Sequence, residues 1–94
     1  MNNTQREALD ILQEECAELI TIASKVKRFG VMSENPQQPG VSAQQRLTQE
    51  MGDVLAMIDL VCKHLDITPL EVSQARQRKM DKLKIYSNLF EDTP

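Results

Sequence analysis

Residues 47–65 read LTQEMGDVLAMIDLVCKHL, and this stretch decides the fold of the chain. Its apolar side chains recur at helical spacing on both sides of the line that Glu50 occupies. Glu50 itself falls between Met57 and Val61, so the helix is apolar over more than half of its circumference. Such a helix must be covered on two sides. Because three helices of one short chain can hardly provide both covers, we expect a homo-oligomer.

Each predicted helix begins with a polar residue placed three positions before a glutamate or glutamine, which is the capping-box pattern. The pairs are Thr4 with Glu7, Ser42 with Gln45, and Thr68 with Glu71. No segment alternates between apolar and polar residues, so no strand is predicted. The sequence therefore predicts an all-α fold in one domain over residues 1–94, with three main helices at about 4–29, 43–65 and 69–88 and a loop at 30–42.

The composition excludes several classes of protein. A net charge of −3 argues against binding to nucleic acid through a basic face. The longest unbroken apolar run, Val54–Ile58, is far too short to span a membrane, and MNNTQRE lacks the apolar stretch of a signal peptide. Cys16 and Cys62 are far apart and His64 is the single histidine, so we expect reduced thiols rather than structural zinc. We expect a soluble, cytoplasmic protein with no nucleic-acid or membrane partner.

The predicted loop at 30–42 reads GVMSENPQQPGVS, with two prolines and two glycines. Connections of about this length without secondary structure are uncommon inside compact domains. Two interpretations stay open from the sequence. The segment is either a plain mobile linker or a loop that closes over a ligand.

Carboxylates occupy unexpected places on the first two predicted helices. At about 100° per residue, Glu15 falls inside the apolar arc of the first helix, with Glu18 on its border and Glu14 just beyond. Glu50 and Asp53 fall among apolar residues of the second helix. A carboxylate that faces a core costs several kcal/mol, roughly, unless charge or hydrogen bonds compensate it. The alternative is an ordinary solvated acidic face.

The acidic residues form two pairs, Glu15 with Glu18 and Glu50 with Asp53, and each pair is three residues apart. Such neighbours on a helix can converge on one point. Four adjacent carboxylates repel one another and raise each other's pKa unless a cation neutralises them. Ligands made only of oxygen suit Mg²⁺, with Mn²⁺ as an alternative, and a hard cation held in this way suggests a phosphate substrate.

The third predicted helix supplies positive charge. Lys79 falls on its apolar stripe and Lys82 at the edge of that stripe. These lysines either extend their charged ends to solvent or meet the carboxylates and the phosphates held there.

Two motifs in the chain match a known signature. EECAE, which contains Glu14, Glu15 and Glu18, is followed by EMGD, which contains Glu50 and Asp53. Together they resemble the EExxE…ExxD signature of the MazG-like, all-α nucleoside triphosphate pyrophosphatases. That superfamily also includes the dimeric dUTPases and the phosphoribosyl-ATP pyrophosphatases. The resemblance covers roughly residues 5–90, although the segment between Glu18 and Glu50 is longer than is usual in the signature.

The resemblance implies a function and an assembly. Family members cleave a nucleoside triphosphate between its α- and β-phosphates, giving the monophosphate and pyrophosphate, and they form dimers or dimers of dimers in which two chains share one helical bundle. The implied roles are Mg²⁺ ligation by Glu15, Glu18, Glu50 and Asp53, help in deprotonating water by Glu14 or Glu15, and phosphate binding by Lys79 and Lys82. The cellular role would be removal of noncanonical or surplus nucleotides.

Other functions fit the same residues. The chain could be a non-catalytic dimeric adaptor whose acidic stripe binds a basic partner, or a member of the fold that binds nucleotides without turnover. Phosphoribosyl-ATP hydrolysis is a further alternative. With Phe29, Tyr86 and Phe90 as its aromatic residues, the chain offers no evident pair for stacking a base, so base, sugar, acceptance of diphosphates and the choice between dimer and tetramer stay open.

Overall fold

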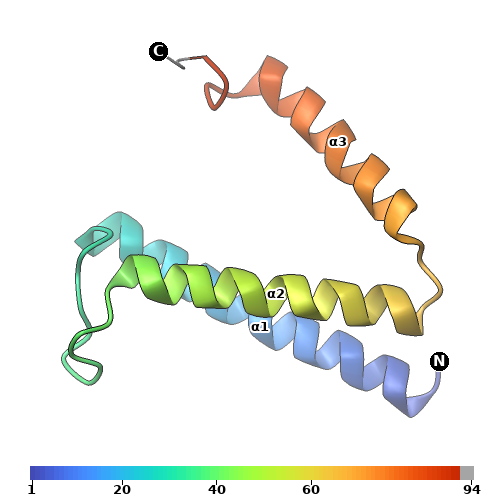
Figure 1. Ribbon diagram of the computed structural model, residues 1–94, viewed down its shortest axis with the longest axis horizontal. Coiled ribbons are helices and arrows are strands. Elements are labelled where there is room, and N and C mark those ends of the chain that lie inside the picture. Colours follow the sequence, from blue (N-terminus) through green and yellow to red (C-terminus); the bar gives the residue numbers. More distant parts are fainter. Residues whose placement is uncertain (92–94) are drawn as a thin grey trace.

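The computed structural model describes residues 1–91, and its regular structure is helical (Figure 1). The helices are α1 (Asn3–Phe29), α2 (Ala43–His64) and α3 (Pro69–Tyr86). No strand occurs within residues 1–91, where a single β-bridge joins Glu34 to Ser42. This architecture confirms the predicted all-α class and the order of three helices.

Local capping explains where the helices begin. Ser42 and Thr68 cap α2 and α3 as predicted, each in a reciprocal capping box. The predicted cap of α1 is wrong by two residues. Asn2 is the cap, because its Oδ1 accepts from the Gln5 backbone N–H at 2.8 Å while Gln5 Oε1 accepts from the Asn2 N–H at 2.9 Å. Asparagine caps a helix better than threonine, so Thr4 lies inside the first turn instead.

Helices α1 and α2 run antiparallel and side by side, and we call this pair the α1–α2 hairpin (Figure 1). Its buried residues are small or aliphatic: Ala8 and Ile22 on α1, and Ala43, Met57 and Val61 on α2. A side-chain bond closes the end of the hairpin away from the loop, where Gln5 Nε2 donates to the His64 carbonyl at 2.9 Å. Cys16 and Cys62 are half-buried free thiols.

Helix α3 leaves this hairpin at an elbow formed by residues 65–68. The Ile67 N–H donates to the Cys62 carbonyl at 3.0 Å, and Asp66 adopts a left-handed conformation with φ 57°. A left-handed residue directly after a helix is a common C-terminal stop, usually filled by glycine. From this elbow α3 points away from the hairpin (Figure 1), and no residue within Pro69–Tyr86 is buried.

The chain is therefore open rather than compact. Its accessible surface is 7570 Å², whereas a compact monomer of this mass exposes about 5,500 Å². The radius of gyration is 16.3 Å, against about 12 Å for a compact domain of this length. Within residues 1–91, no helix has the length and apolar character needed to span a membrane.

Candidate metal centre

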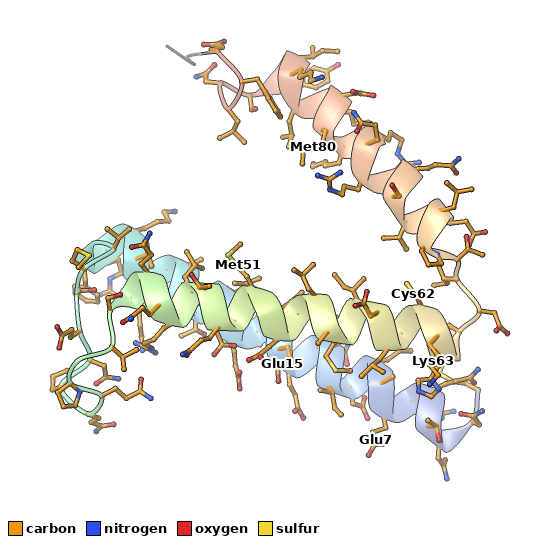
Figure 2. The ribbon with its side chains drawn as sticks, viewed as in Figure 1. Glu7, Glu15, Met51, Cys62, Lys63 and Met80 are labelled. Atoms are coloured by element: carbon orange, nitrogen blue, oxygen red, sulfur yellow. The ribbon has the colours of Figure 1, made fainter. Side chains whose placement is uncertain are left out.

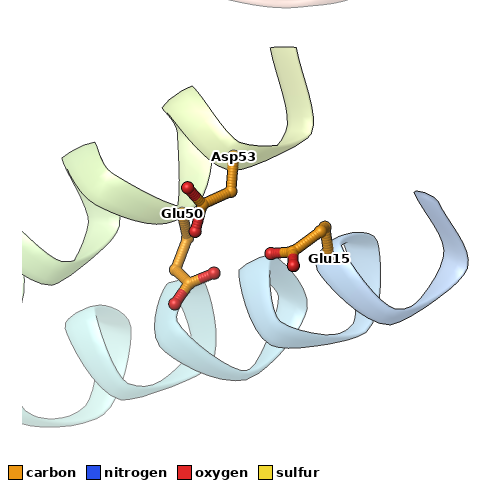
Figure 3. Close-up of side chains that lie close together, drawn as sticks. All are labelled: Glu15, Glu50 and Asp53. Atoms are coloured by element: carbon orange, nitrogen blue, oxygen red, sulfur yellow. The ribbon is translucent and has the colours of Figure 1, made fainter. Parts of the chain in front are cut away.

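The α1–α2 hairpin brings together three of the four carboxylates that the sequence singled out. Glu15 on α1 faces Glu50 and Asp53 on α2 (Figure 3). One oxygen from each carboxylate can be chosen so that all three lie within 4.8 Å of one another. Because α1 and α2 are antiparallel, residues far apart in the sequence meet here. Helical spacing then puts Glu50 and Asp53 on the same side of α2.

Two of these carboxylates have an oxygen that is buried and without a partner. Glu15 and Glu50 are half-buried, and the Oε2 atom of each is shielded from solvent with no hydrogen bond. Asp53 is exposed. Buried side-chain oxygens in folded proteins are nearly always hydrogen-bonded, since an unpartnered one costs about 1–3 kcal/mol or more when charged. Both oxygens lie where α1 and α2 face each other, within the group formed by Glu15, Glu50 and Asp53.

Burial and mutual repulsion both raise the pKa of two carboxyl groups in this cluster. Burial raises the pKa of the Glu15 carboxyl above its usual 4.5, and repulsion from Glu18 and Asp53 raises it further. Burial also raises the pKa of Glu50 above 4.5, again with repulsion from Glu18 and Asp53. No lysine or arginine in the described part of the chain lies within 4.0 Å of these carboxylates. A cation bound here would remove the cause of both repulsive contributions.

The other two predicted acids have different positions. Glu18 is exposed and lies outside the group of three converging oxygens, but it lines a cavity of about 390 Å³ beside Glu50. It is close enough to raise the pKa of both Glu15 and Glu50, so it remains a neighbour of the cluster. Glu14 is exposed on α1 and does not belong to the converging group within residues 1–91.

The predicted phosphate-binding lysines do not join the cluster within one chain. Lys79 and Lys82 are both exposed on α3. Since α3 points away from the hairpin, the structure does not bring them to the carboxylates (Figure 2). Any meeting between these lysines and the carboxylates requires α3 of another copy or a different placement of α3.

Sequence reasoning missed one cationic residue beside the site, Arg46. It lies four residues before Glu50 on α2, and this spacing puts both side chains on one face. Arg46 is half-buried and lines the cavity that also contains Glu18 and Glu50. The signal for it in the sequence is the arginine of QQRLTQE, one helical turn before the predicted ligand Glu50.

Loop 30–42 was the other feature whose role the sequence left open. Backbone hydrogen bonds hold it in a defined shape: the Ala43 N–H donates to the Ser33 carbonyl at 2.8 Å, and the Gln44 N–H to the Val31 carbonyl at 2.9 Å. Glu34 Oε1 also accepts from the Gly40 N–H at 2.7 Å. The loop and the adjoining helix ends line a second, open cavity of about 390 Å³. The loop therefore forms the wall of a pocket.

Comparisons of the chain with protein-family models, with curated proteins and with solved structures found no match. The fold and the site define an antiparallel helical hairpin that directs three carboxylates toward one point. Two of these carboxylates have a buried oxygen without a hydrogen-bond partner.

Proposed function

We propose that this protein is a Mg²⁺-dependent nucleoside triphosphate pyrophosphohydrolase that converts NTPs or dNTPs to the monophosphate and pyrophosphate. In the cytoplasm, this activity would clear noncanonical or surplus nucleotides. The observation that carries the proposal is the convergence of Glu15, Glu50 and Asp53, with an orphaned buried oxygen on each of the two glutamates. The match of EECAE and EMGD to the pyrophosphatase signature supports it.

The donor set fits a hard divalent cation. Carboxylate oxygens are the ligands that Mg²⁺ and Mn²⁺ prefer, and Mg²⁺ commonly takes one or two of them together with water and substrate phosphates. Glu15, Glu50 and Asp53 would hold the ion. Glu18, which is close enough to raise the pKa of Glu15 and Glu50, would be the fourth ligand. A bound ion would offset the charge of the triphosphate and make a coordinated water more acidic.

The reaction requires a base close to the attacking water. The water oxygen forms a bond to the α-phosphorus, the bond from that phosphorus to the bridging oxygen breaks, and pyrophosphate leaves with the electron pair. The proton of the water passes to a carboxylate. Glu15 suits this role better than Glu14, because Glu15 faces the cluster and its burial raises its pKa, whereas Glu14 is exposed.

A second copy of the chain would cover apolar surface that one chain leaves exposed. The surface of one chain exceeds that of a compact monomer by about 2,000 Å², which is the scale that large, permanent homodimer interfaces bury. Large apolar side chains are exposed on both arms of the open chain: Met51 and Leu55 on α2, and Ile85 and Tyr86 on α3. Met51 and Cys62 lie on the side of α2 that faces α3 (Figure 2).

We therefore propose a homodimer, or a dimer of such dimers, in which helices of two chains form one bundle. The α3 of each copy would cover the exposed apolar side of the partner hairpin. Such an arrangement would also bring Lys79 and Lys82 of one copy close to the carboxylates of the other copy. There the two lysines would bind the pyrophosphate leaving group.

The experiment that tests the activity is an assay of pyrophosphate release across common and damaged NTPs with and without Mg²⁺. Glu50→Gln and Asp53→Asn should each reduce the Mg²⁺-dependent rate by about 100-fold or more, because even indirect partners of metal ligands matter at the 10–100-fold level. Glu7→Gln is the matched control, because Glu7 is exposed on α1 about two turns from Glu15. Full activity of both cluster variants would overturn the proposal.

The same assay, together with a thermal-shift measurement, separates the proposal from the adaptor alternative. A non-catalytic helical adaptor with an acidic binding stripe predicts no pyrophosphate release and no thermal stabilisation by Mg²⁺ with a non-hydrolysable nucleotide. A chain that binds nucleotides without turnover predicts stabilisation but no release.

A further inference from the structure

An open cavity of about 390 Å³ adjoins the carboxylate cluster, and we call it the inner cavity. Its lining consists of Ala17, Glu18, Thr21 and Ile22 on α1 and of Arg46 and Glu50 on α2. Within residues 1–91, Arg46 is the single cationic residue of this lining. The Thr21 hydroxyl donates to the Ala17 carbonyl at 3.0 Å, so the donors available to a ligand are those of the Arg46 guanidinium.

The charge of Arg46 is not used by the folded chain. Arg46 is half-buried, yet no carboxylate within residues 1–91 lies within 4.0 Å of its charged nitrogens. Glu50 follows it by one helical turn, but arginine before glutamate is the less favourable order for an ion pair at this spacing. Arg46 is also the fourth residue of α2, close to the helix end with partial positive charge, where the dipole disfavours a cation. Neither an ion pair nor the helix dipole therefore accounts for an arginine here.

The spacing between Glu50 and Arg46 fits a chain of phosphates. Four residues cover about 6 Å along α2, and the direction from Glu50 to Arg46 leads away from Asp53. With the α-phosphorus of a triphosphate beside the carboxylates, the β- and γ-phosphates extend over about this length. They can therefore occupy the inner cavity, with the terminal phosphate next to Arg46. A guanidinium matches the oxygens of a phosphate with two parallel hydrogen bonds.

The carboxylates that share the inner cavity are compatible with phosphates there. Glu18 and Glu50 are proposed ligands of Mg²⁺, and proteins commonly hold Mg²⁺ through one or two carboxylates together with substrate phosphates. The negative charge of the phosphates would be offset by the ion at one end of the cavity and by Arg46 at the other end.

We propose that Arg46 binds the pyrophosphate portion of the substrate, which lies in the inner cavity between Glu50 and the first turn of α2. This inference rests on the proposed function and adds the direction of the substrate. The leaving group points toward loop 30–42, and the nucleoside lies on the other side of the carboxylates. Arg46 offsets the charge that develops on pyrophosphate as its bond to the α-phosphorus breaks. Because a diphosphate has one phosphate fewer with which to reach Arg46, the site prefers triphosphates.

Calorimetric titration of inorganic pyrophosphate into the full chain with Mg²⁺ tests this contact without turnover and without a base. Arg46→Gln should weaken binding by about tenfold or more, because it removes hydrogen bonds between charged groups. Arg46→Lys keeps the charge without the paired donors and should lose less. Arg6→Gln is the matched control, at an exposed position about 18 Å along α1 from Glu18, and should bind as wild type does. Wild-type affinity in Arg46→Gln, or no saturable binding to wild type, would overturn the inference.

A titration of Mn²⁺ in the absence of phosphate separates this role from a structural one. Arg46→Gln removes no proposed metal ligand, so its affinity for Mn²⁺ should equal or exceed that of wild type. Equal losses of Mn²⁺ and pyrophosphate affinity would mean that Arg46 acts by supporting the carboxylates, which would overturn the inference. Circular dichroism of each variant checks that its helices are retained.

Steady-state kinetics test the preference for triphosphates. Formation of the monophosphate is followed from the triphosphate and from the diphosphate of one nucleoside. In Arg46→Gln, kcat/KM for the triphosphate should fall by about tenfold or more, and the preference over the diphosphate should shrink. Arg6→Gln should retain both the rate and the preference.

The outcomes distinguish this inference from the proposed activity. Normal pyrophosphate release with unchanged kcat/KM and unchanged pyrophosphate affinity in Arg46→Gln would overturn the role of Arg46 and leave the activity standing. Pyrophosphate binding that depends on Arg46, without release of pyrophosphate from any NTP, would support the phosphate site and overturn the activity alone.

Discussion

The α1–α2 hairpin and α3 differ in how much of their surface one chain buries. The hairpin has a core that includes Ile22 and Met57, and its carboxylates already converge. Helix α3 begins with an equally clear cap but buries no residue of its own. Local signals therefore suffice to form a helix, whereas the packing of a helix requires a complementary surface. Helices α1 and α2 provide that surface for each other within one chain. We propose that α3 finds it in a second copy.

The largest expected effect concerns the exposed face of α2. Leu55 is 62% exposed in one chain, so Leu55→Asp should change the stability of a monomer by less than about 0.5 kcal/mol. If a second copy covers Leu55, the buried charge should convert the dimer to monomers. Analytical ultracentrifugation distinguishes the two, with Ser24→Asp on the exposed face of α1 as the control. A wild-type chain that is monomeric at all concentrations would contradict the proposed assembly.

The next effect concerns the core of the hairpin. Ile22 is only 2% exposed, so Ile22→Ala should lower the free energy of unfolding by about 2–5 kcal/mol through lost burial and a residual cavity. Urea denaturation measures this loss. Ile20→Ala is the matched control on the same helix, since Ile20 is 70% exposed in one chain. Equal losses for the two variants would mean that Ile20 is buried in the assembly.

The carboxylate cluster should make stability depend on pH and on Mg²⁺. Folding raises the pKa of Glu15 and Glu50, so the folded state holds their protons more tightly than the unfolded state does. Their contribution is therefore fully present below the unfolded value of about 4.5 and is lost as pH rises through the raised pKa values of the folded state. In EDTA, the melting temperature should fall as the pH rises above about 4.5 and through the raised pKa values, and Mg²⁺ should restore it at the higher pH.

Glu50→Gln provides the control for this pH dependence. It removes one repelling charge, so in EDTA at pH 7.5 it should melt at a higher temperature than wild type and show a smaller dependence on pH. The same variant should be inactive, which is the pattern expected where a functional site is kept at a cost to stability. A variant that is less stable than wild type in EDTA would contradict the repulsion argument.

The smallest effect concerns the cap of α3. Thr68 Oγ1 accepts from the Glu71 N–H at 3.1 Å, and Thr68→Ala should cost about 1 kcal/mol. Because α3 has no buried residue within its chain, the loss should appear as fraying of α3, with faster amide exchange at residues 70–73. Exchange in α1 and α2 should be unchanged. Uniformly faster exchange would show that α3 and the hairpin unfold as one unit.

The sequence predicted the parts of this molecule that depend on near neighbours. The caps at Ser42 and Thr68 and the helical spacing gave the three helices, because both signals act within a few residues. The helical wheel also placed Glu50 between Met57 and Val61, and both of these residues are buried. The start of α1 was wrong because Asn2 and Gln5 offer a competing capping box with the stronger cap residue.

The parts that escaped prediction depend on residues distant in the sequence. The cavity beside loop 30–42 requires Lys25, Asn35 and Arg46 to lie close together, and no local spacing indicates that. The direction of α3 is set by the elbow at Asp66, where a non-glycine residue adopts the left-handed conformation that usually marks glycine. The convergence of Glu15 with Glu50 was predicted from their shared apolar surroundings, and the structure leaves Glu18 beside this group rather than within it.

The main proposal is a divalent cation held by the carboxylates of the hairpin. Its most direct test is a titration of Mn²⁺ into the protein, followed by electron paramagnetic resonance of the free ion, for wild type, Glu50→Gln and Glu7→Gln. We expect saturable binding to wild type and to Glu7→Gln that Mg²⁺ displaces, and a loss of about tenfold or more in affinity in Glu50→Gln. Equal Mn²⁺ binding by all three proteins, or no saturable binding to wild type, would contradict it.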